Sequence, residues 1–169
     1  MIKIKTAAEN DISTIENILT DALAWKDIDV IGMSLWSNDS IQWKHLSTTF
    51  KASDFYIAYL DGVPAACVAV SDHDPEFWAD IPKGESLFIN KLAVMRFAAK
   101  QGLADALISH VKSVCADKNI SALRLICHSH IPKLRSVYER NGFVCVNEKI
   151  LYEKYHTAFY KCDIYDERR

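Results

Sequence analysis

Residues 92–104 read Leu-Ala-Val-Met-Arg-Phe-Ala-Ala-Lys-Gln-Gly-Leu-Ala, and this stretch decides the fold. An apolar run predicts a strand over residues 87–94, and an apolar periodicity predicts a helix that begins at Gly102. The first N–H groups of such a helix have no backbone acceptor, and the helix dipole makes this end positive. Small residues at Gly102 and Ala104 keep side chains away, and Lys100 adds a cation. The junction therefore suits an anion such as a pyrophosphate, although a strand-to-helix turn with an incidental glycine explains the same residues.

The N-terminal part of the chain predicts a strand followed by a long helix. Apolar and basic residues alternate over residues 2–5, which predicts a short strand. Thr6, with Glu9 three positions later, matches a capping box, and the apolar spacing behind it predicts a helix to about residue 24. Residues 25–50 are less regular, and we expect one or two short helices there around a loop.

The remaining elements follow from turn residues and apolar runs. Asp61 and Gly62 lie between two apolar segments, which predicts a hairpin of strands over residues 55–60 and 63–70. Pro132 suits the first turn of a short helix that stops at Asn141-Gly142. The last expected strands cover residues 123–127, 143–146 and 158–164.

Composition excludes several classes of protein. The 169 residues carry a net charge of −2 with both signs mixed, so they lack the clustered basic surface that nucleic-acid binding needs. No run of about eighteen apolar residues and no signal-peptide pattern is present, so we expect a cytoplasmic protein without a membrane partner. Five widely spaced cysteines form no C-x-x-C pair, which favours buried thiols over a zinc site or disulfides. We expect one domain over residues 1–169.

Two motifs, in this order, resemble the GNAT superfamily of acetyl-CoA-dependent N-acetyltransferases. The first runs from Leu92-Ala93-Val94 through a short loop to Gly102-Leu103-Ala104. The second is Leu134-x-x-x-Tyr138-Glu139-x-x-Gly142-Phe143. The opening strand, the helix and the Asp61-Gly62 hairpin are similar to the N-terminal half of the family, and Asp74-Pro75-Glu76-Phe77-Trp78 is similar to one bacterial subgroup. The resemblance therefore covers nearly the whole chain.

This resemblance implies an α/β (α+β) fold with a mixed, mostly antiparallel, seven-stranded sheet and about four helices on its two faces. It also implies that the sheet opens at its middle to admit the cofactor. The implied reaction moves an acetyl group from acetyl-CoA to an amine-bearing small molecule or peptide, without a metal. The motifs do not identify the acceptor, and a homodimer is compatible with the sequence.

The resemblance also assigns roles to individual residues. The N–H of Val94 would polarise the thioester carbonyl, at a strand end whose backbone binds the pantetheine arm. Tyr138 occupies the position of the general acid that protonates the departing thiolate, and a tyrosine packed on the sheet is the alternative. The implied cofactor-binding residues are Leu92, Ala93, Val94, Ala99, Lys100, Gln101, Gly102, Leu103, Ala104 and Lys133.

Two positions depart from the family pattern. Ala99 stands where the family usually has Arg or Gln, so one side-chain contact is lost while the backbone N–H is kept. Ile131 stands where members often carry Asn, which removes a polar contact near the cofactor. Both departures predict weaker binding of coenzyme A. They also keep open a second hypothesis, a non-catalytic domain that binds or senses acyl-CoA.

The general base and several other side chains stay open. Glu85 and Asp72 flank predicted strands and could take the proton of the amine, although each also suits a solvated loop. His128 and His130 lie two residues apart at a strand end and form a metal-site hypothesis that lacks a third ligand. Three tryptophans would either line the acceptor cleft or fill the core: Trp36, Trp43 and Trp78.

Overall fold

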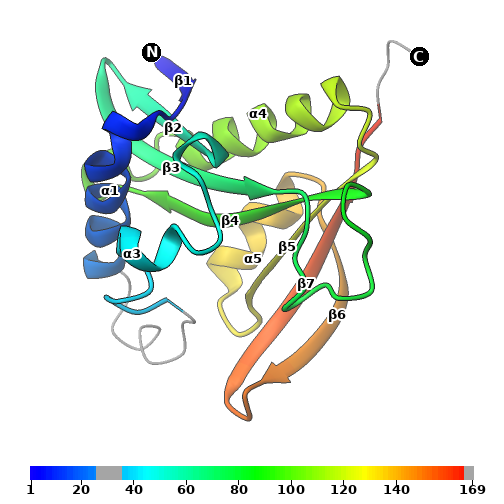
Figure 1. The fold of residues 1–169 in the computed structure, drawn as a ribbon. Helices are drawn as coiled ribbons and strands as arrows, with labels where there is room; N and C mark the ends of the chain where they lie inside the picture. Colours follow the sequence, from blue (N-terminus) through cyan, green and yellow to red (C-terminus); the bar gives the residue numbers. More distant parts are fainter. Residues whose placement is uncertain (26–35, 166–169) are drawn as a thin grey trace. The chain divides into compact units, whose positions relative to one another are not determined.

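The computed structural model describes residues 1–25 and 36–165 (Figure 1). Its seven strands are β1 (Ile2–Thr6), β2 (Phe55–Leu60), β3 (Val63–Ser71), β4 (Ser86–Val94), β5 (Ala122–His128), β6 (Val144–Leu151) and β7 (Tyr155–Asp163). They form one sheet in the order β1-β2-β3-β4-β5-β7-β6. β4 and β5 are parallel, whereas β1·β2, β2·β3, β5·β7 and β6·β7 are antiparallel. The predicted mixed, mostly antiparallel, seven-stranded sheet is confirmed.

The described residues contain four α-helices, which are α1 (Ile12–Trp25), α3 (Trp43–Leu46), α4 (Leu103–Asp117) and α5 (Pro132–Arg140). Three short 3-10 turns accompany them, η1 (Glu9–Asp11), η2 (Ala52–Asp54) and η3 (Arg96–Ala98). α3 is one of the short helices expected within residues 25–50, and the part of that expectation on residues 26–35 lies outside the described residues. No helix in the described ranges combines the length and the apolar character needed to cross a bilayer.

The chain divides into two compact units. The first contains Met1–Ala69 and Asn90–Leu107, and the second contains Val70–Ile89 and Ile108–Arg169. β4 and α4 each contribute residues to both units. Each unit has a hydrophobic cluster of its own.

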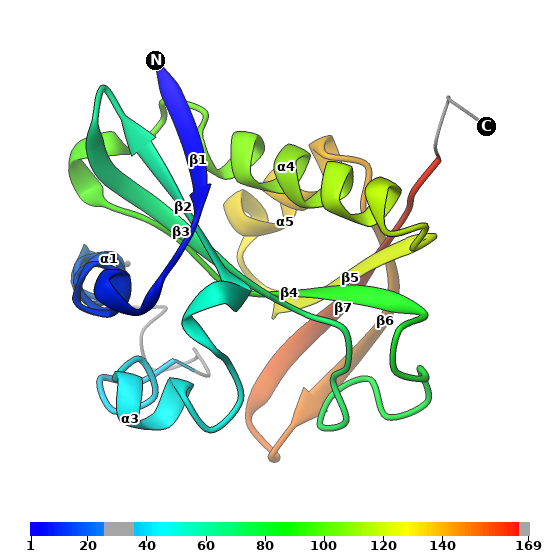
Figure 2. The same cartoon turned by 45° about the horizontal axis from the view of Figure 1, so that its top comes forward.

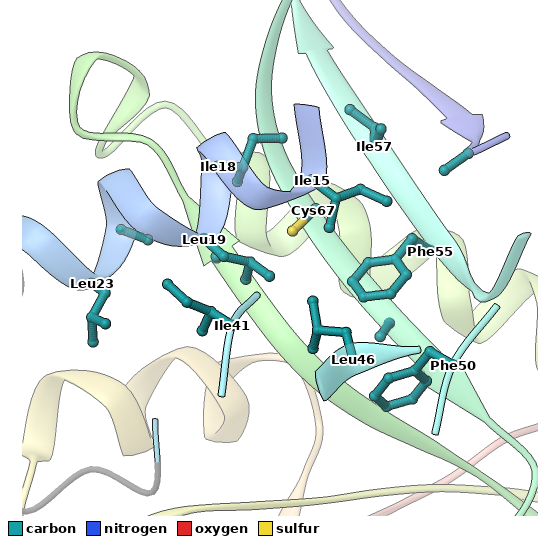
Figure 3. Close-up of a cluster of buried hydrophobic side chains, with 14 residues drawn as sticks. Ile15, Ile18, Leu19, Leu23, Ile41, Leu46, Phe50, Phe55, Ile57 and Cys67 are labelled. Carbon is teal, nitrogen blue, oxygen red and sulfur yellow. The ribbon is translucent and has the colours of Figure 1, made fainter. Parts of the chain in front are cut away.

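The core of the first unit joins α1 to strands β2 and β3 (Figure 3). α1 buries five side chains at helical spacing, Ile15, Ile18, Leu19, Ala22 and Leu23. They pack with Phe55 and Ile57 of β2 and with Cys67 of β3. Because a fully buried Ile, Leu or Phe contributes roughly 1.5–3 kcal/mol, this face fixes α1 on the sheet.

The entry to α1 differs from the predicted capping box. Thr6 still belongs to β1, where it pairs with Tyr56 of β2. The chain then turns through η1, and the backbone N–H of Ala8 donates to Asp11 Oδ2 at 2.8 Å. The capping box of Thr6 and Glu9 is therefore wrong, because pairing with β2 keeps Thr6 extended and moves the turn further along the chain.

The hairpin between β2 and β3 is confirmed. Asp61 and Gly62 have φ angles of 49° and 84°, so both central residues of the turn are left-handed. This is the conformation of a type I′ turn, whose twist matches that of the two strands. The turn brings Leu60 opposite Val63 and so starts the register of the whole pair.

The sheet of the second unit is covered on both faces (Figure 2). Phe159 of β7 packs with Trp78 and Phe88 in one cluster. Tyr160, the next residue of β7, has its ring 6.2 Å from that of Tyr138 on α5. Because successive strand residues point to opposite faces, α5 covers one face and the segment that joins β3 to β4 covers the other.

β6 and β7 are longer than predicted. β6 continues to Leu151 and β7 starts at Tyr155, with a three-residue turn between them. The unpredicted part of β6 carries Asn147, Glu148 and Lys149, which are exposed. Polar and charged residues are common on an edge strand, and they leave no apolar alternation for a sequence pattern to detect.

All five cysteines are free thiols. Cys67, Cys115, Cys127 and Cys162 are buried, and Cys145 is half-buried. The prediction of small buried hydrophobic thiols is confirmed for the first four.

Candidate functional site

The loop between β4 and α4 contains two left-handed residues. Lys100 has a φ of 63° and Gly102 a φ of 81°. A Cβ atom at Gly102 would meet no other atom within 4 Å, so backbone conformation, and not lack of space, favours glycine there. The carbonyl of Gly102 accepts a hydrogen bond from Ala106 N at 3.0 Å. α4 therefore begins directly after Gly102.

Five consecutive N–H groups at this junction have no acceptor among the described residues. Within the described part of the chain, no hydrogen bond uses the backbone N–H of Lys100, Gln101, Gly102, Leu103 or Ala104. Leu103 and Ala104 open α4, so their N–H groups lie at the positive end of the helix dipole. Lys100, Gln101 and Gly102 are exposed. The junction can therefore donate several hydrogen bonds to an anion from solvent.

Ala99 does not contribute a free donor to this row. Its N–H donates to Arg96 O at 3.2 Å and closes η3. The side chain of Gln101 also bonds within the loop, because Nε2 donates to Phe97 O at 3.4 Å. The backbone N–H that we expected Ala99 to keep for the anion is engaged in the turn.

Two side chains of α1 hold the start of the loop. Asp21 Oδ2 accepts from the backbone N–H of Arg96 at 2.8 Å, and Trp25 Nε1 donates to Val94 O at 3.2 Å. Asp21 and Trp25 are four residues apart, so they lie on one face of the helix. Sequence analysis missed both, because the contacts join residues 75 and 69 positions apart. Their helical spacing is the single signal that could have suggested a shared partner.

The strand side of the junction is anchored in the first unit. Ala93 is buried in its core, and Leu92 and Val94 are half-buried. Just after the strand, the N–H of Met95 donates to Ala65 O of β3 at 2.8 Å. Lys91 has a φ of 52°, so regular strand conformation is interrupted directly before the Leu92-Ala93-Val94 motif.

Tyr138 lies on α5, in the second unit, and its side chain is 6 % exposed. Its ring packs edge-on against Phe143 at 5.9 Å. Within the described residues no hydrogen bond of its hydroxyl is found. Burial raises the pKa of Tyr138 above its usual value, and nearby Cys127 adds to this. Tyr138 therefore stays protonated at neutral pH and can donate a hydrogen bond.

A hydrogen-bonded network holds α5 against β6 and β7. Arg135 Nε donates to the hydroxyl oxygen of Tyr160 at 2.8 Å, and Arg135 Nη1 donates to Glu148 Oε1 at 2.7 Å. The Tyr160 hydroxyl donates in turn to Glu139 Oε1 at 2.7 Å. Burial and the bond to Glu139 raise the pKa of Tyr160 to about 12, against the opposite effect of Arg135. The network ties the helix that carries Tyr138 to the sheet beneath it.

Ile131 and Lys133, the other two candidate residues near α5, lie at the start of this helix. Ile131 is the N-cap residue and has no side-chain capping bond, and its carbonyl accepts from Leu134 N and Arg135 N at 3.1 Å each. Pro132 occupies the first turn, as predicted. Lys133 is exposed. The departure at Ile131 therefore removes a side-chain cap from the helix.

The two candidate bases are exposed carboxylates. Glu85 Oε1 lies 3.9 Å from Arg124 Nη2, and Asp72 Oδ1 lies 3.9 Å from Lys83 Nζ. Both belong to the second unit. Loose ion pairs of this kind fit solvated loop positions.

His128 and His130 lie beside a third histidine that the sequence did not indicate. The His130 ring is 5.6 Å from that of His128 and stacks on that of His156 at 4.3 Å. The backbone N–H of His130 donates to His128 Nδ1 at 3.1 Å, so His128 Nε2 carries the proton. This nitrogen is buried and has no hydrogen-bond partner within the described part of the chain. Among the described residues, no group of three or more His, Cys, Asp and Glu side chains is arranged to hold a metal ion.

The three tryptophans lie in or against hydrophobic clusters. Trp36 and Trp43 are partly buried against the core of the first unit. Trp78 is 9 % exposed and belongs to the cluster of the second unit. Trp78 therefore packs in a hydrophobic cluster, and Trp36 lies under the Lys91 ammonium, which is 5.1 Å from the centre of its ring.

The candidate residues fall into two sets. Those of the junction, from Leu92 to Ala104, belong to the first unit. Tyr138 and Lys133 belong to the second. Hydrogen bonds within the first unit hold the junction in place, and hydrogen bonds within the second unit hold α5 in place.

Comparison with known proteins gives a family and a fold. A model of the Acetyltransferase (GNAT) family matches residues 21–143. No curated protein matches the sequence. Among solved structures, the chain is similar to Ard1 from Thermoplasma volcanium, with a TM-score of 0.72 and 15 % identity over 98 % of this chain and 99 % of that one.

Two further structures are similar over nearly their full lengths. The ribosomal-protein-S18-alanine N-acetyltransferase from Escherichia coli has a TM-score of 0.72 and 16 % identity over 100 % of this chain and 99 % of that one. The PaiA N-acetyltransferase from Thermoplasma acidophilum, in complex with coenzyme A, has a TM-score of 0.71 and 14 % identity over 96 % and 99 %. At these identities the likeness shows the fold, and the matched model adds the family. The chain belongs to the GNAT acetyltransferase family.

Proposed function

We propose that this protein transfers an acetyl group from acetyl-CoA to the amine of a small molecule or peptide. The observation that carries the proposal is the row of five unpaired N–H groups from Lys100 to Ala104, in a chain of the GNAT family. A pyrophosphate needs several donors that converge without intervening side chains, and a glycine-containing helix start provides them.

The junction would hold the cosubstrate mainly through its backbone. Gly102, Leu103 and Ala104 would donate to the pyrophosphate, and Lys100, with Lys133 on α5, would add positive charge. The backbone of residues 92–94 would bind the pantetheine arm. β5 pairs with β7 from Ala122 to His128 but with β4 only from Ala122 to Arg124, which supports a sheet that opens at this point.

Tyr138 would assist departure of the leaving group. Acetyl-CoA supplies the thioester, and cleavage of its C–S bond releases a thiolate whose conjugate acid has a pKa of about 8.5, by analogy with cysteine. The hydroxyl of Tyr138 would donate to that sulfur. Its raised pKa keeps the donor protonated over the whole neutral range.

Organisation and compartment are part of the proposal. The family match runs from residue 21 to residue 143 and includes residues of both units, which supports one acetyltransferase domain over residues 1–169. Free thiols favour a reducing compartment, so we propose the cytoplasm.

The test is release of free coenzyme A from acetyl-CoA in the presence of a panel of amines. Release that depends on both partners would establish the transferase. Cofactor binding without release from any amine would favour the sensing domain, which Ala99 and Ile131 keep in consideration.

Melting temperature gives an independent measurement of cofactor binding. A ligand at a hundredfold excess over its Kd stabilises the folded chain by about 2.7 kcal/mol. At roughly 2–4 °C per kcal/mol, millimolar acetyl-CoA should raise the melting temperature by several degrees. Coenzyme A should act nearly as strongly, and NAD, which lacks the pantetheine arm, much less. No shift with either coenzyme would contradict both the transferase and the sensor.

A further inference from the structure

A cavity of about 350 Å³ lies within the second unit, on the face of its sheet opposite α5. Residues 76–81 form one wall. Val146, Asn147 and Lys149 of β6 and Phe159 of β7 form the other. None of the residues that line this cavity has a role in the reaction proposed above. The volume of the cavity suits a compact organic molecule.

The aromatic residues of this cavity are held firmly. The rings of Trp78 and Phe159 meet edge-on at 5.2 Å. The guanidinium of the buried Arg124 lies 5.1 Å from the centre of the Trp78 ring, and Arg124 Nε donates to Ser86 Oγ at 2.9 Å. Trp78 is 9 % and Phe159 3 % exposed, so the cavity reaches a small and fixed part of their apolar surface.

Charged groups line the same cavity. Glu76 and Asp80 are exposed carboxylates on one wall, and Lys149 is the cation on the other. The ammonium of Lys149 lies 5.1 Å from the centre of the Phe159 ring. The chain's own lysine thus shows that an ammonium group is accommodated against this aromatic surface. The lining contains two carboxylates and one ammonium, so it carries an excess of negative charge that favours a further cation.

Backbone conformation indicates that the wall is a built feature. Asp74 orders it, because its Oδ1 accepts from Phe77 N at 3.1 Å. Across the cavity, Tyr152 and Glu153 form the turn between β6 and β7 with φ angles of 51° and 63°, which is costly for residues other than glycine or asparagine. From this turn the Tyr152 hydroxyl donates a hydrogen bond to Glu76 Oε1. The turn thereby fixes one of the cavity's two carboxylates.

We propose that this cavity binds the acceptor, and that the acceptor is a cationic amine with an apolar or aromatic body. The inference rests on the proposed function. The entering amine and the departing thiolate occupy different sides of the reacting carbonyl carbon. Tyr138, which would serve the thiolate, lies on the α5 side of β7, and the cavity lies on the other side. Glu76 and Asp80 hold the entering ammonium, and one of these carboxylates takes a proton from it, so that the nitrogen lone pair can attack the carbonyl carbon as the thiolate leaves. Trp78 and Phe159 contact the body.

The experiment measures binding by calorimetry without acetyl-CoA. The probes are 2-phenylethylamine, which combines a ring with an ammonium, and 3-phenylpropionate, which has a similar shape and the opposite charge. The test variant is Glu76→Gln with Asp80→Asn, which keeps both shapes and an acceptor oxygen for Tyr152. The control is Glu9→Gln with Asp39→Asn, two exposed carboxylates of the first unit that undergo the same change in charge.

We expect the wild-type chain and the control to bind 2-phenylethylamine, and the test variant to bind it about tenfold more weakly. We expect 3-phenylpropionate not to bind. Absence of amine binding at millimolar concentration, equal affinity in the two double variants, or equal binding of the carboxylate would each overturn the proposal.

Activity measurements separate this proposal from the transferase itself. If amines bind as described but no amine releases coenzyme A, the cavity assignment stands and the proposed reaction is wrong. If amines release coenzyme A at an unchanged kcat/KM in the Glu76→Gln, Asp80→Asn variant, the reaction stands and the cavity assignment is wrong.

Discussion

The β4–α4 junction would bind the proposed cosubstrate through backbone groups, whereas α5 would act through a side chain. At the junction the N–H groups from Lys100 to Ala104 have no acceptor among residues 1–25 and 36–165, and backbone groups do not depend on side-chain identity, so Ala99 can replace a larger residue without loss of that row. On α5 the proposed chemistry depends on one hydroxyl group, that of the buried Tyr138. Binding at the junction should therefore depend on its backbone conformation, whereas turnover should depend on the identity of one side chain of α5. The following substitutions test this contrast.

The largest effect should come from Tyr138→Phe. The ring and its packing against Phe143 are kept, so stability and acetyl-CoA affinity should change little. Loss of the proton donor should lower kcat by about 10²–10⁴. Steady-state kinetics with calorimetry would measure both quantities, and Tyr165→Phe, at an exposed position, is the control. A variant that turns over at the wild-type rate would remove Tyr138 from the mechanism.

Gly102→Val should have the next largest effect, on binding. A branched side chain disfavours a φ of 81° by about 1–3 kcal/mol, so the free N–H groups would lose their common direction. We expect coenzyme A affinity to fall roughly tenfold to a hundredfold, as measured by calorimetry. Gly62→Val is the matched control, because Gly62 has a φ of 84° and equally open surroundings in a hairpin turn. Equal losses of affinity in both variants would show that general destabilisation, and not the junction, is responsible.

Asp21→Ala should have a smaller effect through the same loop. It removes the acceptor of Arg96 N–H, which frees the start of the junction to move. We expect coenzyme A affinity to fall about fivefold, and Asp21→Asn to recover most of it because an acceptor oxygen remains. Thr20→Ala, at an exposed neighbouring position of α1, should change nothing. A similar loss in the Asn variant would mean that the charge of Asp21, and not its hydrogen bond, matters.

The smallest effect concerns pH and the histidine cluster. Burial lowers the pKa of His128, and His130 and His156 lower it further. The unfolded chain therefore takes up this proton first, so stability present above the ordinary pKa of about 6.5 is lost as the pH falls through it toward the lowered value. Urea unfolding at a series of pH values should show this loss, reduced in His128→Gln and unchanged in His45→Gln. An identical pH dependence in His128→Gln would contradict the assignment.

The sequence was most informative where a pattern is local. Apolar periodicity predicted α1 and α4, and Asp61-Gly62 predicted the hairpin, because each signal lies within a few residues of the structure that it produces. Polar residues of β6 gave no alternation, so the strand was predicted too short. The entry to α1 was misplaced because pairing of Thr6 with β2, a distant segment, overrides the local capping signal.

The site was predictable to the same degree. The glycine and the helix start at Gly102 could be located from sequence, since both depend on neighbouring residues. Asp21 and Trp25 could not, because their partners lie on a loop far along the chain. The cavity beneath residues 76–81 was equally hidden, as it forms only when that segment folds over β6 and β7.

Buried thiols have a practical consequence for measuring the proposed reaction. Burial raises the pKa of Cys115 and Cys127 to about 12 and also raises those of Cys67 and Cys162. Disulfide reagents react with thiolates, so these four side chains should give little background colour, whereas free coenzyme A reacts rapidly in solution. Cys145 is the one half-buried cysteine. In a Cys145→Ser variant, the signal of such a reagent would come from released coenzyme A and not from protein thiols.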